Sequence, residues 1–202
     1  MQTMRDQIVA RIRRFEDGKP FSAKDFLDIA SRGTIDMTLS GLTRDGTIRR
    51  IRRGLFDKPK VSPSLGGKLS PDIDEAARAI ARTEKWKIVP DGAWAANLLG
   101  LSTQVPSKIV YMTDGPNNEV PIGRRSIYFK HAGPKAMTGL DGKFALVVQT
   151  LRYLGKGGVG APEIQKLRAA LTPAERRKLL KDTRFGVGWI YEVAKRIAET
   201  TA

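Results

Sequence analysis

The sequence lacks cysteine entirely and contains a single histidine, His131. The chain therefore has no disulfide bonds, no thiolate metal ligands and no multi-histidine metal site. No apolar run approaches the roughly 20 residues that a membrane helix needs. Residues 1–18 alternate charged and apolar side chains and lack the apolar core of a signal peptide. We therefore expect a cytoplasmic protein that uses no metal, no cofactor and no membrane.

Acidic residues are also scarce, with 21 Asp and Glu against 36 Lys and Arg, which gives a net charge of +15. The excess is +6 in residues 1–60, +3 in residues 61–150 and +6 in residues 151–202. Such an excess indicates a polyanionic partner, although a basic surface can also serve solubility alone. The charge lies mainly at the two ends of the chain.

Residues 21–60 have the pattern of two short helices, a turn and a basic β-hairpin. Ser22 and Asp25 have the spacing of a capping box, which predicts a helix over residues 23–30. Its apolar residues, which we expect to be buried, are Phe26, Leu27, Ile29 and Ala30. Residues 31–33 then form a turn, and Thr34 caps a second helix over residues 35–44.

The second helix has two different faces. Ile35, Leu39 and Leu42 fall on one side and are expected to be buried. The opposite side is small and mostly polar, which suits close approach to base edges, and it holds Gly33, Met37, Ser40 and Arg44, flanked by Asp36 and Gly41. There Arg44 could bind guanine or phosphate, and Met37 could contact a thymine methyl group. An ordinary surface helix has the same pattern, and the hairpin that follows favours the groove-reading interpretation.

Asp45 and Gly46 end this helix, and two strands follow over residues 47–51 and 55–58. Because Ile48 and Ile51 differ in parity, we expect a bulge or an early end of the strand. The hairpin is strongly basic, with Arg49, Arg50, Arg52, Arg53, Lys58 and Lys60 against Asp57 alone. Clustered cations of this kind position a protein on phosphates and make its binding depend on salt.

The order of these elements predicts an N-terminal winged helix-turn-helix. One helix would enter a groove of double-stranded DNA while the hairpin holds the backbone. The residues expected to contact DNA are Arg32, Thr34, Asp36, Met37, Ser40, Arg44, Arg49, Arg50, Arg52, Arg53, Lys58 and Lys60.

The rest of the chain predicts a second module. Residues 61–71 are rich in Pro, Gly and Ser and are expected to be a linker between a domain over residues 1–60 and one over residues 72–202. The second domain begins with mixed helices and strands, including a clear strand over residues 108–114, and ends in basic helices. The predicted class is α+β, with a winged helix followed by a mixed α/β domain and a helical C-terminal region.

No set of residues reaches the standard of an active site, so we do not expect an enzyme. Residues 156–160, KGGVG, resemble the start of a phosphate-binding loop but lack the preceding strand and the Lys and hydroxyl that such a loop needs. His131 has no nucleophile-elbow motif to accompany it. The carboxylates Asp72, Asp74 and Glu75 are better explained as the acidic first turn of a helix.

Two segments carry a resemblance to a known family. The first ends in a basic hairpin and contains Leu42, Gly46, Ile48, Arg53, Gly54, Leu55 and Phe56. The second, GAWAANLLGLSTQVPSKIVYMTDGP, contains Gly92, Ala95, Leu98, Leu99, Gly100, Leu101, Gln104, Val105 and Pro106. Together, over about residues 21–131, they resemble AbiEi-type antitoxins, although Phe56 stands where Tyr is commoner in that family.

The resemblance implies a transcriptional autorepressor that binds operator repeats. It also implies an antitoxin of a type IV, abortive-infection-like system of phage defence, which counteracts a nucleotidyltransferase-type toxin without necessarily binding it. Two alternatives remain open. One is a stand-alone winged-helix regulator whose second domain senses a ligand or forms dimers. The other is an RNA-binding or RNA-modifying enzyme that uses the basic C-terminal helices, although the absence of a catalytic set of residues argues against it.

Overall fold

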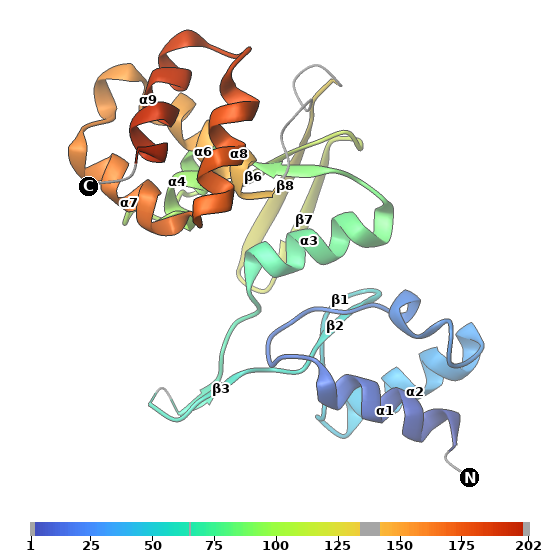
Figure 1. Ribbon diagram of the computed structural model, residues 1–202. Helices are drawn as coiled ribbons and strands as arrows, with labels where there is room; N and C mark the ends of the chain where they lie inside the picture. Colours follow the sequence, from blue (N-terminus) through green and yellow to red (C-terminus); the bar gives the residue numbers. More distant parts are fainter. Residues whose placement is uncertain (1–2, 65, 134–141, 200–202) are drawn as a thin grey trace. The chain divides into compact units, whose positions relative to one another are not determined.

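The computed structural model describes residues 3–64, 66–133 and 142–199 (Figure 1). Helices and small sheets alternate along the chain, in agreement with the α+β class. The chain forms two compact units, one of residues 1–87 with 119–127 and one of residues 88–118 with 128–202. The predicted domain boundaries stay a prediction, because compactness alone does not show which segments fold independently.

The first unit begins with the elements of the predicted helical and hairpin region. These are α1 (Met4–Arg14), the 3₁₀ helix η1 (Ala23–Phe26), α2 (Arg32–Arg44), β1 (Arg49–Arg52) and β2 (Leu55–Asp57). Then follow β3 (Val61–Ser62), β4 (Gly67–Lys68) and α3 (Ile73–Glu84). β1 and β2 are antiparallel, and their register shifts between Arg50 and Arg52, which confirms the expected irregularity in the first strand.

A cluster of phenylalanine rings joins these elements. The ring of Phe21 lies 5.2 Å from that of Phe15, 5.7 Å from that of Phe26 and 6.3 Å from that of Phe56, measured between centroids. Phe21 and Phe56 also bond through their main chains, so the segment after α1 is attached to β2. Helices α1 and α2 complete this core with Ile8, Ile12, Ile35, Leu39 and Leu42. The apolar face predicted for the second helix is therefore confirmed.

The predicted length of the first helix, residues 23–30, was wrong. Its capping box forms, with the main-chain N–H of Ser22 donating to Asp25 at 2.7 Å, but regular 3₁₀ structure ends at Phe26. Phe26 is fully buried, and its carbonyl accepts from Ile29 in a further turn. Leu27, expected in the core, is consequently 54% exposed. Tertiary burial of one ring has overridden the local helical pattern.

The start of α2 also differs from the prediction. Ser31, rather than Thr34, is its N-cap, and its side chain accepts from the main-chain N–H of Thr34 at 3.4 Å. Arg32 and Gly33 therefore belong to the first turn of the helix instead of the preceding turn. The helix therefore begins at Arg32 rather than at Ile35, nearly one turn earlier than the sequence predicted.

The segment predicted as a linker contains structure of its own. β3 and β4 form a short antiparallel hairpin, in which Val61 pairs with Lys68 and Ser62 with Gly67. The main-chain N–H of Leu69 donates to the carbonyl of Lys60 at 2.8 Å and closes the base of this hairpin.

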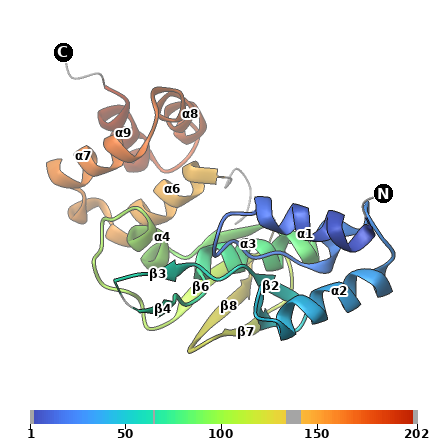
Figure 2. The ribbon, with the colours of Figure 1, turned by 90° about the horizontal axis from the view of Figure 1, so that it is seen from below.

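The remaining elements are a four-stranded sheet and a group of helices (Figure 2). Residues 119–127 of the sheet belong to the first unit, and its other strand residues and the helices belong to the second. The four-stranded sheet has the order β5-β6-β8-β7, with β5 (Ile88–Pro90), β6 (Ile109–Thr113), β7 (Asn118–Ile122) and β8 (Arg125–His131). The helices are α4 (Gly92–Leu98), α6 (Gly142–Leu154), η2 (Lys156–Gly158), α7 (Ala161–Ala170), α8 (Pro173–Thr183) and α9 (Gly188–Ala198). Helices α6, α7, α8 and α9 share a core that includes Val147, Leu151, Ile164, Leu167, Leu179, Ile190 and Ile197.

Helix α4 approaches α6 through a glycine. A Cβ atom added at Gly92 would lie 2.6 Å from the Cβ of Tyr153 and 2.9 Å from the carbonyl oxygen of Gln149. No other residue type fits this contact without a shift of backbone. Two residues later, the indole N–H of Trp94 donates to the buried hydroxyl of Tyr111 on β6 at 2.7 Å.

Candidate nucleic-acid interface

The exposed face of α2 is small and open. Met37, at its centre, is 74% exposed, Ser40 is half-buried and Arg44 is exposed. A Cβ atom added at Gly33 or Gly41 would meet nothing within 4 Å. The backbone of this face is therefore accessible to a partner surface, as base readout in a groove requires.

The one acidic residue predicted on this face is paired with an arginine. Asp36 pairs with Arg32 one turn earlier, with the Arg32 Nε atom 3.0 Å and 2.9 Å from its two carboxylate oxygens. This pairing reduces the repulsion that a lone carboxylate would exert on phosphate. Thr34 is half-buried and hydrogen-bonds to the hydroxyl of Ser31 at 3.1 Å, so it acts within the helix start.

Three arginines of the β1–β2 hairpin are at least partly exposed. The guanidinium of Arg50 lies over the ring of Phe56, 5.4 Å from its centroid, while Arg53 is exposed at the turn and Arg52 is half-buried beside it. Arg50, Arg52 and Arg53 have no ion pair within the described ranges 3–64, 66–133 and 142–199. Gly54 has a φ of +78°, a conformation that glycine adopts readily, and it follows these arginines at the turn.

Arg49 has a different environment from the other arginines of the hairpin. Its guanidinium donates two hydrogen bonds to the carboxylate of Asp57 on the facing strand, with nitrogen-to-oxygen distances of 3.0 Å and 2.5 Å. It also donates to the carbonyl oxygen of Leu69 at 2.8 Å. The side chain of Asp57 is fully buried, and only 27% of that of Arg49 is exposed. Arg49 therefore stabilises the base of the hairpin, and little of its donor capacity remains for phosphate.

The two lysines predicted as contacts also differ from one another. Lys58 pairs with Asp17 at 2.8 Å and donates to the carbonyl of Arg13 at 3.3 Å, so it ties β2 to the end of α1. Lys60 is exposed. The predicted set thus contains residues that face solvent together with at least two, Arg49 and Lys58, that hold the unit together.

Sequence reasoning missed a further cation beyond the C-terminal end of α2. The Nζ atom of Lys68, on β4, lies 3.5 Å from the carbonyl of Gly46, which follows the C-cap residue of α2. The β3–β4 hairpin therefore starts beside the C-terminal end of the helix. The neighbouring Gly66 and Gly67 were the available signal, since paired glycines often mark a hairpin turn rather than a linker.

The connection between α2 and β1 is fixed by Asp45. Its carboxylate accepts from the main-chain N–H of Thr47 at 3.0 Å, and the hydrogen bonds from Thr47 hold the pKa of Asp45 below its usual value. The charged form is favoured, and it holds the turn from which the hairpin leaves the helix.

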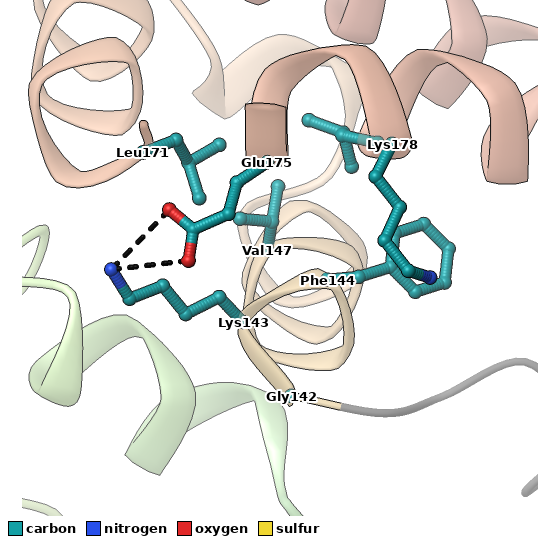
Figure 3. A pocket seen from close by; sticks show the side chains of 8 residues that line it. Gly142, Lys143, Phe144, Val147, Leu171, Glu175 and Lys178 are labelled. Carbon is teal, nitrogen blue, oxygen red and sulfur yellow. Dashed lines mark hydrogen bonds and ion pairs between the residues drawn. The ribbon is translucent and has the colours of Figure 1, made fainter. Parts of the chain in front are cut away.

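A pocket of about 230 Å³ lies in the second unit between the start of α6 and α8 (Figure 3). Its apolar wall is formed by Phe144, Val147, Leu171 and Leu179. The charged groups at its rim are already engaged. Lys143 lies 3.4 Å from Glu175, while Lys178 pairs with Asp182 and lies over the ring of Phe144. We read these contacts as the packing of α8 onto α6.

Residues that resembled chemical sites have structural roles. A ring nitrogen of His131 lies 2.8 Å from the carbonyl oxygen of Gly115, and its main-chain N–H donates to the side chain of Asn117. Asp72 caps α3, and Lys156–Gly158 form the 3₁₀ turn after α6. Within the described part of the chain, no three His, Asp or Glu residues are grouped so that they could hold a metal ion.

No helix among the described residues is both long and apolar enough to cross a membrane.

The family model of DUF6088, a family of unknown function, matches residues 7–179. The chain belongs to the DUF6088 family. The DUF6088 match includes all of the candidate interface, from α2 to β4, and extends through most of α8. No curated protein matches the chain.

Proposed function

We propose that this member of DUF6088 binds double-stranded DNA through a winged helix-turn-helix. In this arrangement η1 and α2 form the helix-turn-helix, α2 enters the major groove, and the β1–β2 hairpin is the wing on the phosphate backbone. The observation that carries the proposal is the open face of α2 in the same unit as Arg50, Arg52 and Arg53, three wing arginines that form no ion pair with any described residue.

The two parts of this interface would contribute differently. The wing arginines supply affinity that does not depend on sequence, because they would neutralise phosphates and release counterions. Met37, Ser40 and Arg44 on α2 would distinguish base pairs by their edges. The Asp36–Arg32 pair supports this assignment, since the arginine offsets part of the repulsion between the Asp36 carboxylate and phosphate.

The proposal is tested with the DNA upstream of the chain's own gene. Binding of a labelled duplex is followed by fluorescence anisotropy from 50 to 300 mM salt for the wild type and for Arg50→Gln/Arg53→Gln. Two lost phosphate contacts should reduce the slope of log K against log salt by about 1.8. Affinity at 150 mM salt should fall at least tenfold.

The matched control is Arg13→Gln/Arg14→Gln, which removes two exposed arginines of α1 and the same amount of charge. It should change the slope by less than half as much as the wing variant. Equal effects of the two variants would mean that only net charge matters and would contradict a wing. Arg49 is left intact in both, because its loss would disturb folding.

We further propose, on the resemblance to AbiEi-type antitoxins, that the chain represses its own operon and counteracts a nucleotidyltransferase-type toxin. The test is growth rescue when the chain is co-expressed with a neighbouring gene that is toxic alone. The wing variant Arg50→Gln/Arg53→Gln should lose repression and keep rescue. If no adjacent gene is toxic, the proposal that the chain is an antitoxin is refuted. The proposal that it regulates transcription as a stand-alone DNA-binding protein is then left.

A further inference from the structure

The loop between α8 and α9 exposes an aromatic side chain. Phe185 is 93% exposed, and Val187 two residues later is 50% exposed. The guanidinium of Arg184 lies 5.7 Å from the centroid of the Phe185 ring. The loop therefore presents an accessible aromatic ring directly beside a cation.

A stripe of cations leads along α8 to this ring. Arg177, Lys181 and Arg184 are spaced four and three residues apart, which places them on one side of the helical path. All three are exposed, and within the part of the chain that the structure describes none of them has an ion pair. The acidic residue of this segment, Asp182, is engaged by Lys178 instead. Cations near a helix C-terminus also complement the helix dipole, but the dipole does not explain an exposed ring.

We propose that the Arg177–Lys181–Arg184–Phe185 stripe binds a segment of single-stranded nucleic acid. One unpaired base would stack on the Phe185 ring, and the cations of α8 would follow the adjoining phosphates. An exposed aromatic ring at the end of a basic track is the combination that single-strand binding uses, because every base has a face that can stack. This site lies in the second unit and does not depend on the proposed duplex binding by the first.

The same features disfavour other occupants. A second copy of the chain would bring two basic stripes together, and their like charges would repel. A membrane surface needs a broader apolar face, whereas Leu179 is buried in the core and Leu180 packs against it, so that Phe185 and Val187 stand alone. Single-stranded nucleic acid matches both the charge and the small apolar area.

The test uses the full chain and a fluorescein-labelled pyrimidine 12-mer, as RNA and as DNA, with the corresponding duplexes for comparison. Phe185→Ala should weaken single-strand binding by about 5- to 150-fold. Val105→Ala, which shortens another exposed apolar side chain of the same unit, should change it by less than twofold. Phe185→Trp should retain binding and show more quenching of tryptophan fluorescence by the oligonucleotide than the wild type does.

A second pair of variants tests the cations. Arg177→Gln/Lys181→Gln should lower the salt slope for single strands by about 1.4, whereas Arg152→Gln/Lys166→Gln removes two exposed charges elsewhere in the unit and should leave it nearly unchanged. Affinity of Phe185→Ala within twofold of the wild type would overturn the proposal. So would Phe185-dependent binding to anionic phosphatidylserine vesicles without binding to oligonucleotide, or equal Phe185 dependence for the duplexes. The wing variant separates the two proposals, since it should retain single-strand binding.

Discussion

Arg49 and Asp57 face each other across the β1–β2 hairpin and form a two-point ion pair whose carboxylate is completely buried. The same arginine reaches the carbonyl of Leu69 beyond the hairpin. A positive charge that appears in the sequence as one of several wing cations is thus the partner of the only acidic residue in the hairpin. Removal of either partner leaves the charge of the other without an opposite charge beside it.

We predict that Arg49→Ala lowers the free energy of unfolding by about 3–5 kcal/mol, because Asp57 is left as a buried unpaired charge. Arg53→Ala, at the exposed turn of the same hairpin, should change it by less than about 0.5 kcal/mol. Urea denaturation followed by circular dichroism measures both. Similar stabilities for the two variants would show that the buried pair is not required for the fold.

Replacement of Gly41 by alanine should have opposite effects on stability and on DNA binding. The added methyl group meets no atom of the protein within 4 Å, and alanine favours helix over glycine by about 1 kcal/mol. Gly41→Ala should therefore stabilise the chain while it weakens duplex affinity, since the methyl group lies beside the face that would approach the bases. A stabilised variant with unchanged affinity would place α2 away from the groove.

Replacement of Arg44 tests whether α2 reads base edges or only binds phosphates. If its guanidinium binds guanine, Arg44→Ala should cost about 1–3 kcal/mol with one preferred sequence and relax the preference at a single position. If it binds phosphate, all sequences should weaken alike and the salt slope should fall by about 0.9. Anisotropy with a set of single-base variants of the bound duplex separates these results.

Acidification should destabilise the chain below about pH 4. Hydrogen bonding from Arg11 holds the pKa of Asp28 below its usual value, and bonding to Thr172 does the same for Glu175. The unfolded chain therefore binds more protons in this range, so the stabilisation present at neutral pH is lost as pH falls through the folded-state pKa values. Urea titrations between pH 7 and pH 2.5 should show this decline.

Asp28→Asn should make that decline smaller, because the variant has no carboxylate at this position to titrate. Glu16→Gln is the control, as Glu16 is exposed and has no ion pair inside the described ranges. A decline of unchanged size in Asp28→Asn would exclude the Arg11–Asp28 pair as a source of the pH dependence.

Periodicity predicted the elements that depend on a single buried face. Ile35, Leu39 and Leu42 on α2 lie in the core as their spacing indicated, and the parity change between Ile48 and Ile51 indicated the irregular strand. Local signals failed where tertiary packing decides the structure. The helix expected over residues 23–30 is cut short where Phe26 enters the aromatic cluster, which joins residues 15, 21 and 26.

For the candidate site, the sequence predicted where the cations lie along the chain but not which of them form ion pairs. The sequence placed the cations on the hairpin, but it did not indicate which of them would be consumed by ion pairs. Arg49 could have been assigned to Asp57 once the strand register was known, whereas the bond of Lys58 to Asp17 joins residues 41 positions apart and depends on the tertiary fold. Phe185 carried no signal of its exposure, because an apolar residue between two helices is commonly buried.

The bond from Arg49 to the carbonyl of Leu69 also sets the length of free chain that leaves the hairpin. A linker of 11 residues over 61–71 would span up to about 40 Å when extended. Because Leu69 is fixed to Arg49 and Asp72 already caps α3, only residues 70 and 71 lie between the two attachments. The tether is therefore about 10 Å at most, counted from Leu69 to Asp72. Leu69 and Asp72 can therefore be no farther apart than that distance, so a larger separation of the hairpin from α3 must break the Arg49 bond.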